Sequence, residues 1–236
     1  MYFDYYYLIL VLPAVLFALW ASLRVNTTFD RYRKQLSACR MTGADAARAV
    51  LDAHGLQHIR IERVSGKLTD HYDPGKQVIR LSDSTYSDTS VAAIGVAAHE
   101  AGHAIQYAEN YAPIRLRAAI IPVTNLGSQL AMPLILIGIL LEGVSAFFSV
   151  LAYVGVACYA LVAVFQLVTL PVEFDASRRA VRVLETMGIL SGDELGGTKK
   201  VLRAAAMTYV AALAVSLMQL LRLMLIVGGN GNRRRR

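Results

Sequence analysis

Long runs of apolar residues separate the chain into membrane-like and polar parts. Four runs are candidates for spanning helices: residues 8–23, 118–141, 144–170 and 204–227. A helix that crosses the hydrocarbon core needs about 20 apolar residues. The third run is the clearest and carries no charge, whereas the first is short unless Tyr5, Tyr6, Tyr7 and Trp20 act as interfacial aromatic anchors. The pattern predicts a mainly α, multi-pass chain with about four transmembrane helices.

The composition supports this prediction. Hydrophobic residues make up 56% of the 236 residues, and the mean hydropathy is +0.44, which is high for a soluble protein. A cleaved signal peptide is the alternative for the first run, but residues 1–23 contain no Lys or Arg, and a signal peptide begins with a basic region. We therefore expect a retained anchor. Cys39 lies in a polar segment and Cys158 in the third apolar run, so a disulfide between them is not expected.

Residues 26–117 form a polar block large enough for a small extramembrane domain. Thr42 with Asp45 resembles a helix start with its capping partner, and Gly55 is placed to end that helix, so a short helix is predicted over residues 43–54. Alternating apolar residues near 59–64 and 78–81 flank the turn signal Asp73-Pro74-Gly75 and predict a β-hairpin or small sheet. The alanine-rich stretch 91–107 contains no proline and predicts a second helix.

The net charge of +7 reflects membrane topology better than nucleic-acid binding. No recognition helix or aromatic stacking platform accompanies the basic residues, so we expect no nucleic-acid partner. The basic residues cluster beside the apolar runs: Arg24, Arg31, Arg33, Lys34, Arg115, Arg117, Arg178, Arg179 and Arg182. The positive-inside rule then predicts that the polar block lies in the cytoplasm and the N-terminus outside. The basic run 233–236 conflicts with this, because four crossings return it outside. Either the last run does not fully cross, or the charges near the earlier helices dominate, which we favour because the first helices weigh most in the rule.

The helix predicted over 91–107 carries the sequence HEAGH, with His99, Glu100 and His103. Histidines four residues apart project from one face of a helix, so both imidazoles can reach one metal ion. Zinc suits this pair, because its catalytic sites use three protein ligands and leave a position for water. Glu100 is next to the first ligand, where a carboxylate can take a proton from that water. The motif predicts a Zn²⁺ site with Glu100 as the catalytic base.

A third ligand is expected from the segment that follows the third apolar run. An even number of predicted crossings separates HEAGH from Glu173 and Asp175, so these carboxylates share a side of the membrane with the histidines. We predict that Glu173 is the third zinc ligand and that Asp175 orients a histidine ring. The alternative is that both carboxylates only pair with the arginines at 178, 179 and 182, one turn further along a helix.

Three segments resemble the bacterial membrane neutral zinc metallopeptidases, the YugP-like group: LTDHYDP at 68–74, AAHEAGHAIQ at 97–106 and PVEFDAS at 171–177. The resemblance covers nearly the whole chain and implies a multi-pass protein with a zincin-like domain of the gluzincin type. In more distant relatives the third ligand is a Glu that opens the pattern ExxAD. Glu173 and Ala176 match this pattern, but Ser177 replaces the Asp, so Ser177 and Asp175 are both candidates to support the zinc histidines.

His71 precedes the active-site helix in the predicted hairpin and has two interpretations. It either donates a hydrogen bond to the oxyanion of a peptide substrate aligned along an edge strand, or it is a solvated turn residue beside Asp70 and Asp73. His54 and His58 are interpreted as a helix-end residue and a loop residue without a functional role.

These predictions together describe an endopeptidase that hydrolyses peptides or membrane-protein segments with metal-activated water. The expected order is an anchor at 1–24, a zincin-like domain at 25–117, a transmembrane hairpin at 118–170, a loop or helix with the third ligand at 171–203, and a last transmembrane helix with a basic tail at 204–236. Two alternatives stay open: a non-catalytic zinc-bearing adaptor or assembly factor, and an intramembrane protease in which residues 91–107 cross the bilayer.

Overall fold

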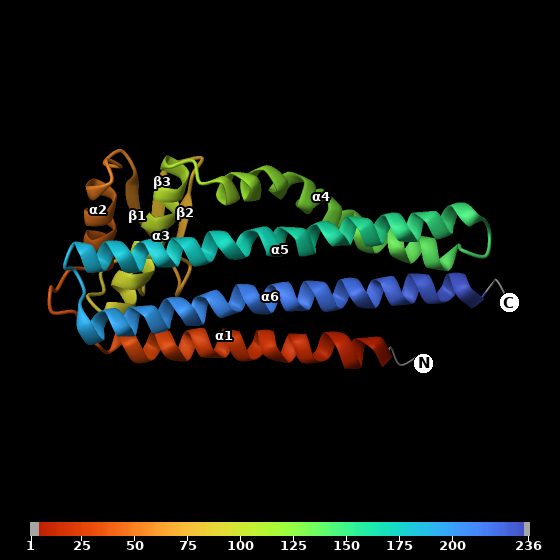
Figure 1. The fold of residues 1–236 in the computed structure, drawn as a ribbon, viewed down its shortest axis with the longest axis horizontal. Helices are drawn as coiled ribbons and strands as arrows, with labels where there is room; N and C mark the ends of the chain where they lie inside the picture. The colour runs from red at the N-terminus through yellow and green to blue at the C-terminus, as the bar shows by residue number, and fades with distance from the viewer. Residues whose placement is uncertain (1–4, 234–236) are drawn as a thin grey trace. The chain divides into compact units, whose positions relative to one another are not determined.

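The computed structural model describes residues 5–233, with side chains as far as Gly229, and the chain forms two compact units. Unit 1 comprises Met1–Trp20, Leu116–Leu170 and Tyr209–Arg236, and unit 2 comprises Ala21–Arg115 and Pro171–Thr208. Helices account for most of the described chain, and a single small sheet lies in unit 2 (Figure 1).

Four long helices match the predicted membrane segments. The first is a π-helical turn, η1 (Tyr7–Val11), that continues into α1 (Leu12–Arg33), and the others are α4 (Ala112–Leu140), α5 (Ala146–Thr186) and α6 (Gly192–Arg233). Each contains a window long and apolar enough to cross a membrane. The prediction of a mainly α, multi-pass chain with about four such helices and a small sheet is therefore confirmed. The basic run predicted at 233–236 lies outside the described side chains.

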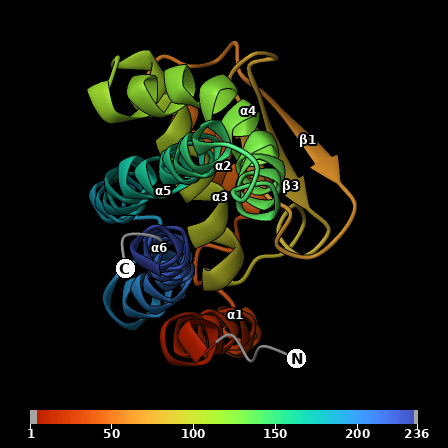
Figure 2. The ribbon, with the colours of Figure 1, turned by 90° about the vertical axis from the view of Figure 1, so that its right-hand side faces the viewer.

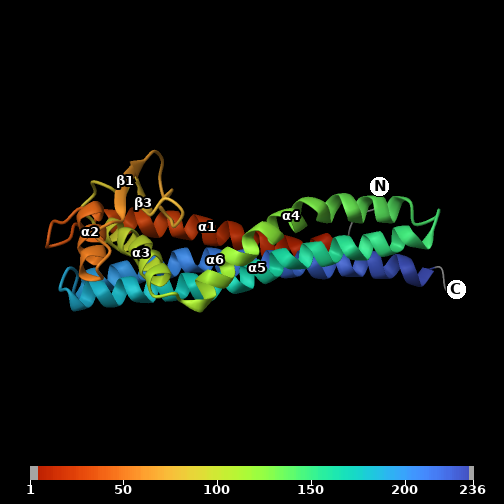
Figure 3. The same cartoon turned by 90° about the horizontal axis from the view of Figure 1, so that it is seen from above.

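Within unit 1, glycines allow α4 and the first half of α5 to pack closely side by side (Figure 3). A Cβ added at Gly138 would lie 2.6 Å from the backbone nitrogen of Ala152, and one added at Gly155 would lie 2.8 Å from the carbonyl oxygen of Ala131. Such small residues are typical of helix interfaces in membranes, where close backbone approach supplies the packing energy.

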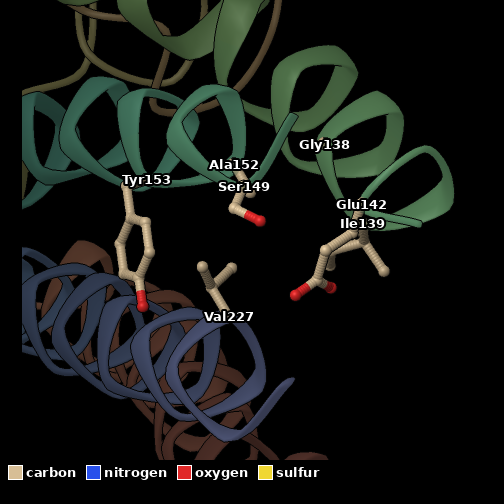
Figure 4. Close-up of a pocket in the computed structure, with 7 residues that line it drawn as sticks. All are labelled: Gly138, Ile139, Glu142, Ser149, Ala152, Tyr153 and Val227. Carbon is tan, nitrogen blue, oxygen red and sulfur yellow. The ribbon is translucent and has the colours of Figure 1, made fainter. Parts of the chain in front are cut away.

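A small pocket in unit 1 lies where α4, α5 and α6 come together, beside Glu142, Ser149, Tyr153 and Val227 (Figure 4). Its volume is about 20 Å³, close to the space that one water molecule requires. The pocket is therefore too small for a peptide side chain or an organic cofactor.

Unit 2 begins with the end of α1 and continues into α2 (Gly43–Ala53), whose boundaries follow from its caps. Thr42 Oγ1 accepts a hydrogen bond from the Asp45 amide, and the Asp45 carboxylate accepts one from the Thr42 amide, which completes a capping box. Gly55 follows the last turn with a φ of +72°, a conformation that glycine adopts without strain. The helix predicted from residue 43 is confirmed.

The sheet has three strands in the order β1-β3-β2: β1 (Arg60–Val64), β2 (His71–Asp73) and β3 (Val78–Ser82). β3 pairs parallel with β1 and antiparallel with β2, so β2 is an edge strand. One face buries Ile79 and Leu81 in the core of unit 2. The other face carries Arg80, which forms ion pairs with Glu62 and Asp73. Val78 and Ser82 on that same face are buried, so β3 is covered on both faces except at the partly exposed Arg80.

Helix α3 (Val91–Ala108) is the centre of unit 2, with β1 and β3 on one side of it (Figure 2). It begins at Ser90, whose Oγ accepts a hydrogen bond from the Ala93 amide. The alanine-rich surface of α3 packs against α2, the sheet and the C-terminal part of α5. Most of its residues are buried, including Glu100, His103 and Gln106. α3 thus holds the HEAGH residues on a rigid, tightly packed element.

Helix α5 does not stop at the end of its apolar run but continues through Pro171 to Thr186. Proline lacks the amide that would bond the carbonyl four residues earlier, a defect that helices at membranes accommodate. The continuation places Glu173, Asp175 and Ser177 on a helix rather than on a loop.

Candidate metal centre

His99 and His103 lie on the same face of α3, one turn apart, as their spacing predicts. Their ring centroids are 4.7 Å apart, and the ring planes cross at 82°. The Nε2 atoms of both rings point toward the same carboxylate oxygen, Oε2 of Glu173. The two imidazoles therefore converge on one point beside the helix.

Glu173 brings the third candidate ligand from α5. Its Oε2 lies 3.3 Å from His99 Nε2 and 3.5 Å from His103 Nε2, and the three donor atoms all lie within 4.8 Å of one another. Two imidazole nitrogens and one carboxylate oxygen form a donor set that zinc uses in hydrolytic sites. The Glu173 side chain is 3% exposed, whereas those of His99 and His103 are 14% and 11% exposed. The site is thus closed on the α5 side and reaches solvent beside the histidines.

The close approach of α3 and α5 depends on Gly102, the fourth residue of HEAGH. A Cβ added there would lie 2.7 Å from the carbonyl oxygen of Ala176, a distance that real Cβ atoms do not reach. Because Ala176 follows Glu173 by less than one turn, Gly102 sets how near the third ligand comes to the histidines.

Glu100 lies on α3 between the two histidines in sequence and is 8% exposed. Burial raises the pKa of Glu100 above its ordinary value, in opposition to the nearby imidazoles of His99 and His103, which lower it. The negative charges of Asp70 and Glu173 raise it further. A carboxylate with a raised pKa is a stronger base, and it is therefore better suited to accept a proton from water at neutral pH.

His103 is held by a hydrogen-bonded chain that continues through Gln106. Burial by itself would lower the pKa of His103, but the Glu173 carboxylate beside its Nε2 outweighs this and raises the pKa above its ordinary value. On the other side of the ring, Nδ1 lies 3.0 Å from Oε1 of Gln106. An Nδ1–H that donates to this oxygen leaves the Nε2 lone pair directed at the metal position.

The amide group of Gln106 is itself fixed by two acceptors on α5. Its Nε2 donates to the carbonyl oxygen of Val172 and to Oδ2 of Asp175, each at 2.9 Å. Because Nε2 of Gln106 donates to both of these acceptors, Oε1 of Gln106 is directed toward His103. Arg179 in turn donates to Asp175 and to Glu109 after α3, so the chain joins both helices.

His99 has a simpler support. Its Nδ1 lies 3.1 Å from Oγ of Ser177 on α5. An Nδ1–H that donates to this hydroxyl again leaves Nε2 free to bind a metal. The two candidates that the sequence offered for this role are therefore both in the site, with Ser177 beside His99 and Asp175 linked to His103 through Gln106.

Comparisons with known proteins agree with this geometry. Residues 7–228 match the model of the family described as "Putative neutral zinc metallopeptidase". The chain is 43% identical over 220 residues to the "Putative membrane protease YugP" of Bacillus subtilis (strain 168), across 93% of this chain and 96% of that protein. No solved structure matches. The chain belongs to the neutral zinc metallopeptidase family.

In this metallopeptidase family member, one predicted site residue, His71, does not lie at the metal position. His71 lies on β2 with its ring exposed, and its Nδ1 is 2.9 Å from the carbonyl oxygen of Thr69. Its Nε2 is 3.5 Å from the guanidinium of Arg80, on the face of the sheet opposite Ile79 and Leu81. The oxyanion role of His71 stays a prediction, and these contacts give it no support. His54 and His58 lie at a helix end and in a loop.

Gln106 is the residue of the site that the sequence interpretation missed. Its spacing could have indicated its role, since Gln106 follows His103 by three residues and therefore lies on the same face of α3. Glutamine on a helix is common, however, and only the contact with Val172 and Asp175 distinguishes this one.

Replacing Gln106 with leucine should weaken zinc binding about 10- to 100-fold, the usual effect of removing a group that orients a zinc histidine. The leucine would fill the buried space but would leave His103 Nδ1 and Asp175 without their amide partner. Competition with a fluorescent zinc chelator measures the change. Gln57→Leu, at an exposed loop position, is the control, and equal zinc affinity in both variants would contradict the orienting role.

Proposed function

We propose that this chain is a zinc-dependent membrane endopeptidase that hydrolyses peptide bonds. The observation that carries the proposal is the convergence of His99, His103 and Glu173, with all three donor atoms within 4.8 Å, beside the buried Glu100. Membership of the metallopeptidase family supports the same reaction class.

The donor set is that of a catalytic zinc site rather than a structural one. Three protein ligands leave one tetrahedral position open, whereas structural sites are closed by four ligands. Among the described residues, only this group of His, Cys, Asp and Glu side chains has metal-site geometry. Bound at His99, His103 and Glu173, zinc would act as a Lewis acid that lowers the pKa of water and polarises a carbonyl group.

The remaining chemistry belongs to the side chains around the metal position. Glu100 accepts the proton of the attacking water and later donates it to the nitrogen of the leaving amine. Ser177 and Gln106 hold the two imidazoles in the tautomer and orientation that present Nε2 to the metal. Strand β2 offers an edge beside α3, along which an extended peptide can add as a further strand.

We further propose that the enzyme acts on peptides or membrane-protein segments at the cytoplasmic face of a bacterial plasma membrane. The four candidate spans and the membrane protease relative support a membrane location. The basic residues near the apolar runs support the cytoplasmic side. Helix α3 is not among the candidate spans of the described chain, which favours an aqueous site over an intramembrane one.

A direct test compares purified wild type with His99→Ala in two assays, metal analysis and digestion of casein. The wild type should contain about one zinc per chain and digest casein, whereas His99→Ala should lose most of both because one of three ligands is missing. His54→Ala is the matched control, since His54 lies at the end of α2 and bonds the carbonyl of Val50. A zinc-loaded wild type that cuts no protein would instead favour the adaptor alternative.

A further inference from the structure

A cavity of about 300 Å³ lies in unit 2 beside the end of the active-site helix. Three of the residues that line it belong to α3: Ala104, Tyr107 and Ala108. The loop between α2 and β1 contributes Leu56, His58 and Ile59, and the β2–β3 hairpin contributes Tyr72, Pro74 and Gln77. The volume is at the lower end of the range for ligand pockets in proteins.

The lining of this cavity is uncharged and mixes polar with apolar surface. None of its residues carries a carboxylate, a lysine or an arginine, and its polar side chains are His58, Gln77, Tyr72 and Tyr107. The rings of Tyr72 and Tyr107 are 5.8 Å apart and tilted by 60°, so two aromatic side chains lie together in it. The paired rings and the absence of charge favour a large apolar or aromatic group over a charged one.

The cavity and the proposed catalytic base, Glu100, lie along the same helix, α3. Tyr107 follows Glu100 by seven residues, which is about two turns, so both side chains project from the same face of α3. Their separation along the helix axis is about 10 Å. An extended peptide rises about 3.3 Å per residue, so a side chain about three residues from the scissile bond reaches the cavity.

Strand β2 connects the cavity to the path of an extended peptide. Tyr72 is its central residue and lines the cavity, whereas His71 and Asp73 contact Arg80 on the other face of the sheet. A peptide added at the edge of β2 would alternate its side chains in the same way. Every second side chain would then be directed to the face on which Tyr72 and the cavity lie.

We infer that this cavity is a specificity subsite that binds a large apolar or aromatic side chain of the peptide substrate, about three residues from the scissile bond. The inference rests on the proposed peptidase function. It adds a substrate class to that function, namely segments with a residue such as Phe, Leu, Met or Tyr at that position, and it assigns Tyr72 and Tyr107 as specificity-determining residues.

The test begins with the cleavage sites that the wild type makes in casein, mapped by mass spectrometry. A large apolar or aromatic residue should recur about three positions from the cut. Two fluorogenic peptides that differ only there, with Phe or Gly, then report the preference. Ala108→Phe and His58→Trp add volume from two different elements that line the cavity and should each lower the Phe-to-Gly ratio of kcat/KM roughly tenfold or more. Ala53→Phe, at the exposed end of α2, is the matched control and should keep the wild-type ratio.

Binding of the same two peptides to the zinc-loaded Glu100→Gln variant separates this inference from the proposed function. Tighter binding of the Phe peptide, abolished by adding Ala108→Phe or His58→Trp, supports the subsite even if the wild type cleaves neither peptide, in which case only the peptidase function fails. Equal binding of both peptides overturns the subsite. So does an unchanged Phe-to-Gly ratio in both filling variants that retain zinc.

Discussion

Glu100→Gln is expected to lower kcat for peptide hydrolysis by about 100- to 10,000-fold, the usual range for loss of a general base. Glutamine has nearly the same shape and fills the same buried space, but it has no basic oxygen that can accept the proton of water. Because Glu100 is not one of the three candidate ligands, the variant should keep about one zinc per chain. Fluorogenic peptide kinetics and metal analysis on the same preparation measure both effects.

Glu185→Gln provides the control for this experiment. Glu185 lies near the end of α5, on the same helix as Glu173, and is exposed. Its replacement should leave kcat and zinc content at wild-type values. A Glu100→Gln protein that cleaves at the wild-type rate would remove Glu100 from the mechanism, and one that loses its zinc would make the residue structural.

Gly102→Ala should lower kcat/KM roughly 100-fold, although it adds only a single methyl group. The new Cβ would lie 2.7 Å from the carbonyl oxygen of Ala176, so α5 must move away from α3. That displacement separates Glu173 from the histidines, and a shift of about 1 Å at a catalytic centre is enough for a loss of this size. Zinc affinity should fall in parallel, as measured by chelator competition.

Gly196→Ala distinguishes this effect from a general consequence of changing a helical glycine. Gly196 lies in α6 within unit 2, and no atom lies within 4 Å of the Cβ it would gain. Alanine should stabilise that helix by about 0.5–1 kcal/mol without affecting zinc or activity. The same zinc affinity in the Gly102 and Gly196 variants would show that the helix spacing does not control the site.

Local sequence patterns were sufficient to predict much of this fold. Apolar runs of spanning length predicted the four long helices, and Thr42, Asp45 and Gly55 marked the ends of α2 because caps act through neighbouring residues. The spacing of His99 and His103 predicted a shared helix face because 3.6 residues per turn fixes it. These features depend on contacts within a few residues, which sequence displays directly.

Features that depend on distant contacts were harder to predict. The strand order β1-β3-β2, with a parallel pair, cannot be read from alternation alone, since both pairings give the same pattern. The even number of predicted membrane crossings placed Glu173 on the same side of the membrane as the histidines. It could not decide whether Asp175 or Ser177 supports the histidine rings. Gln106 stayed unnoticed because its acceptors, Val172 and Asp175, belong to a helix more than 60 residues away in sequence.

X-ray absorption spectroscopy at the zinc edge of the purified protein reports the atoms bound to the metal, so it tests the site of His99, His103 and Glu173 itself. The protein should hold one zinc per chain, with two imidazole nitrogens near 2.0–2.1 Å and oxygen as the other bound atoms, including one from Glu173. In Glu173→Ala, the imidazole signal should persist in whatever zinc is retained while zinc affinity falls. A sulfur ligand from Cys39 or Cys158, or a spectrum and affinity unchanged by Glu173→Ala, would show that these three residues do not form the zinc site.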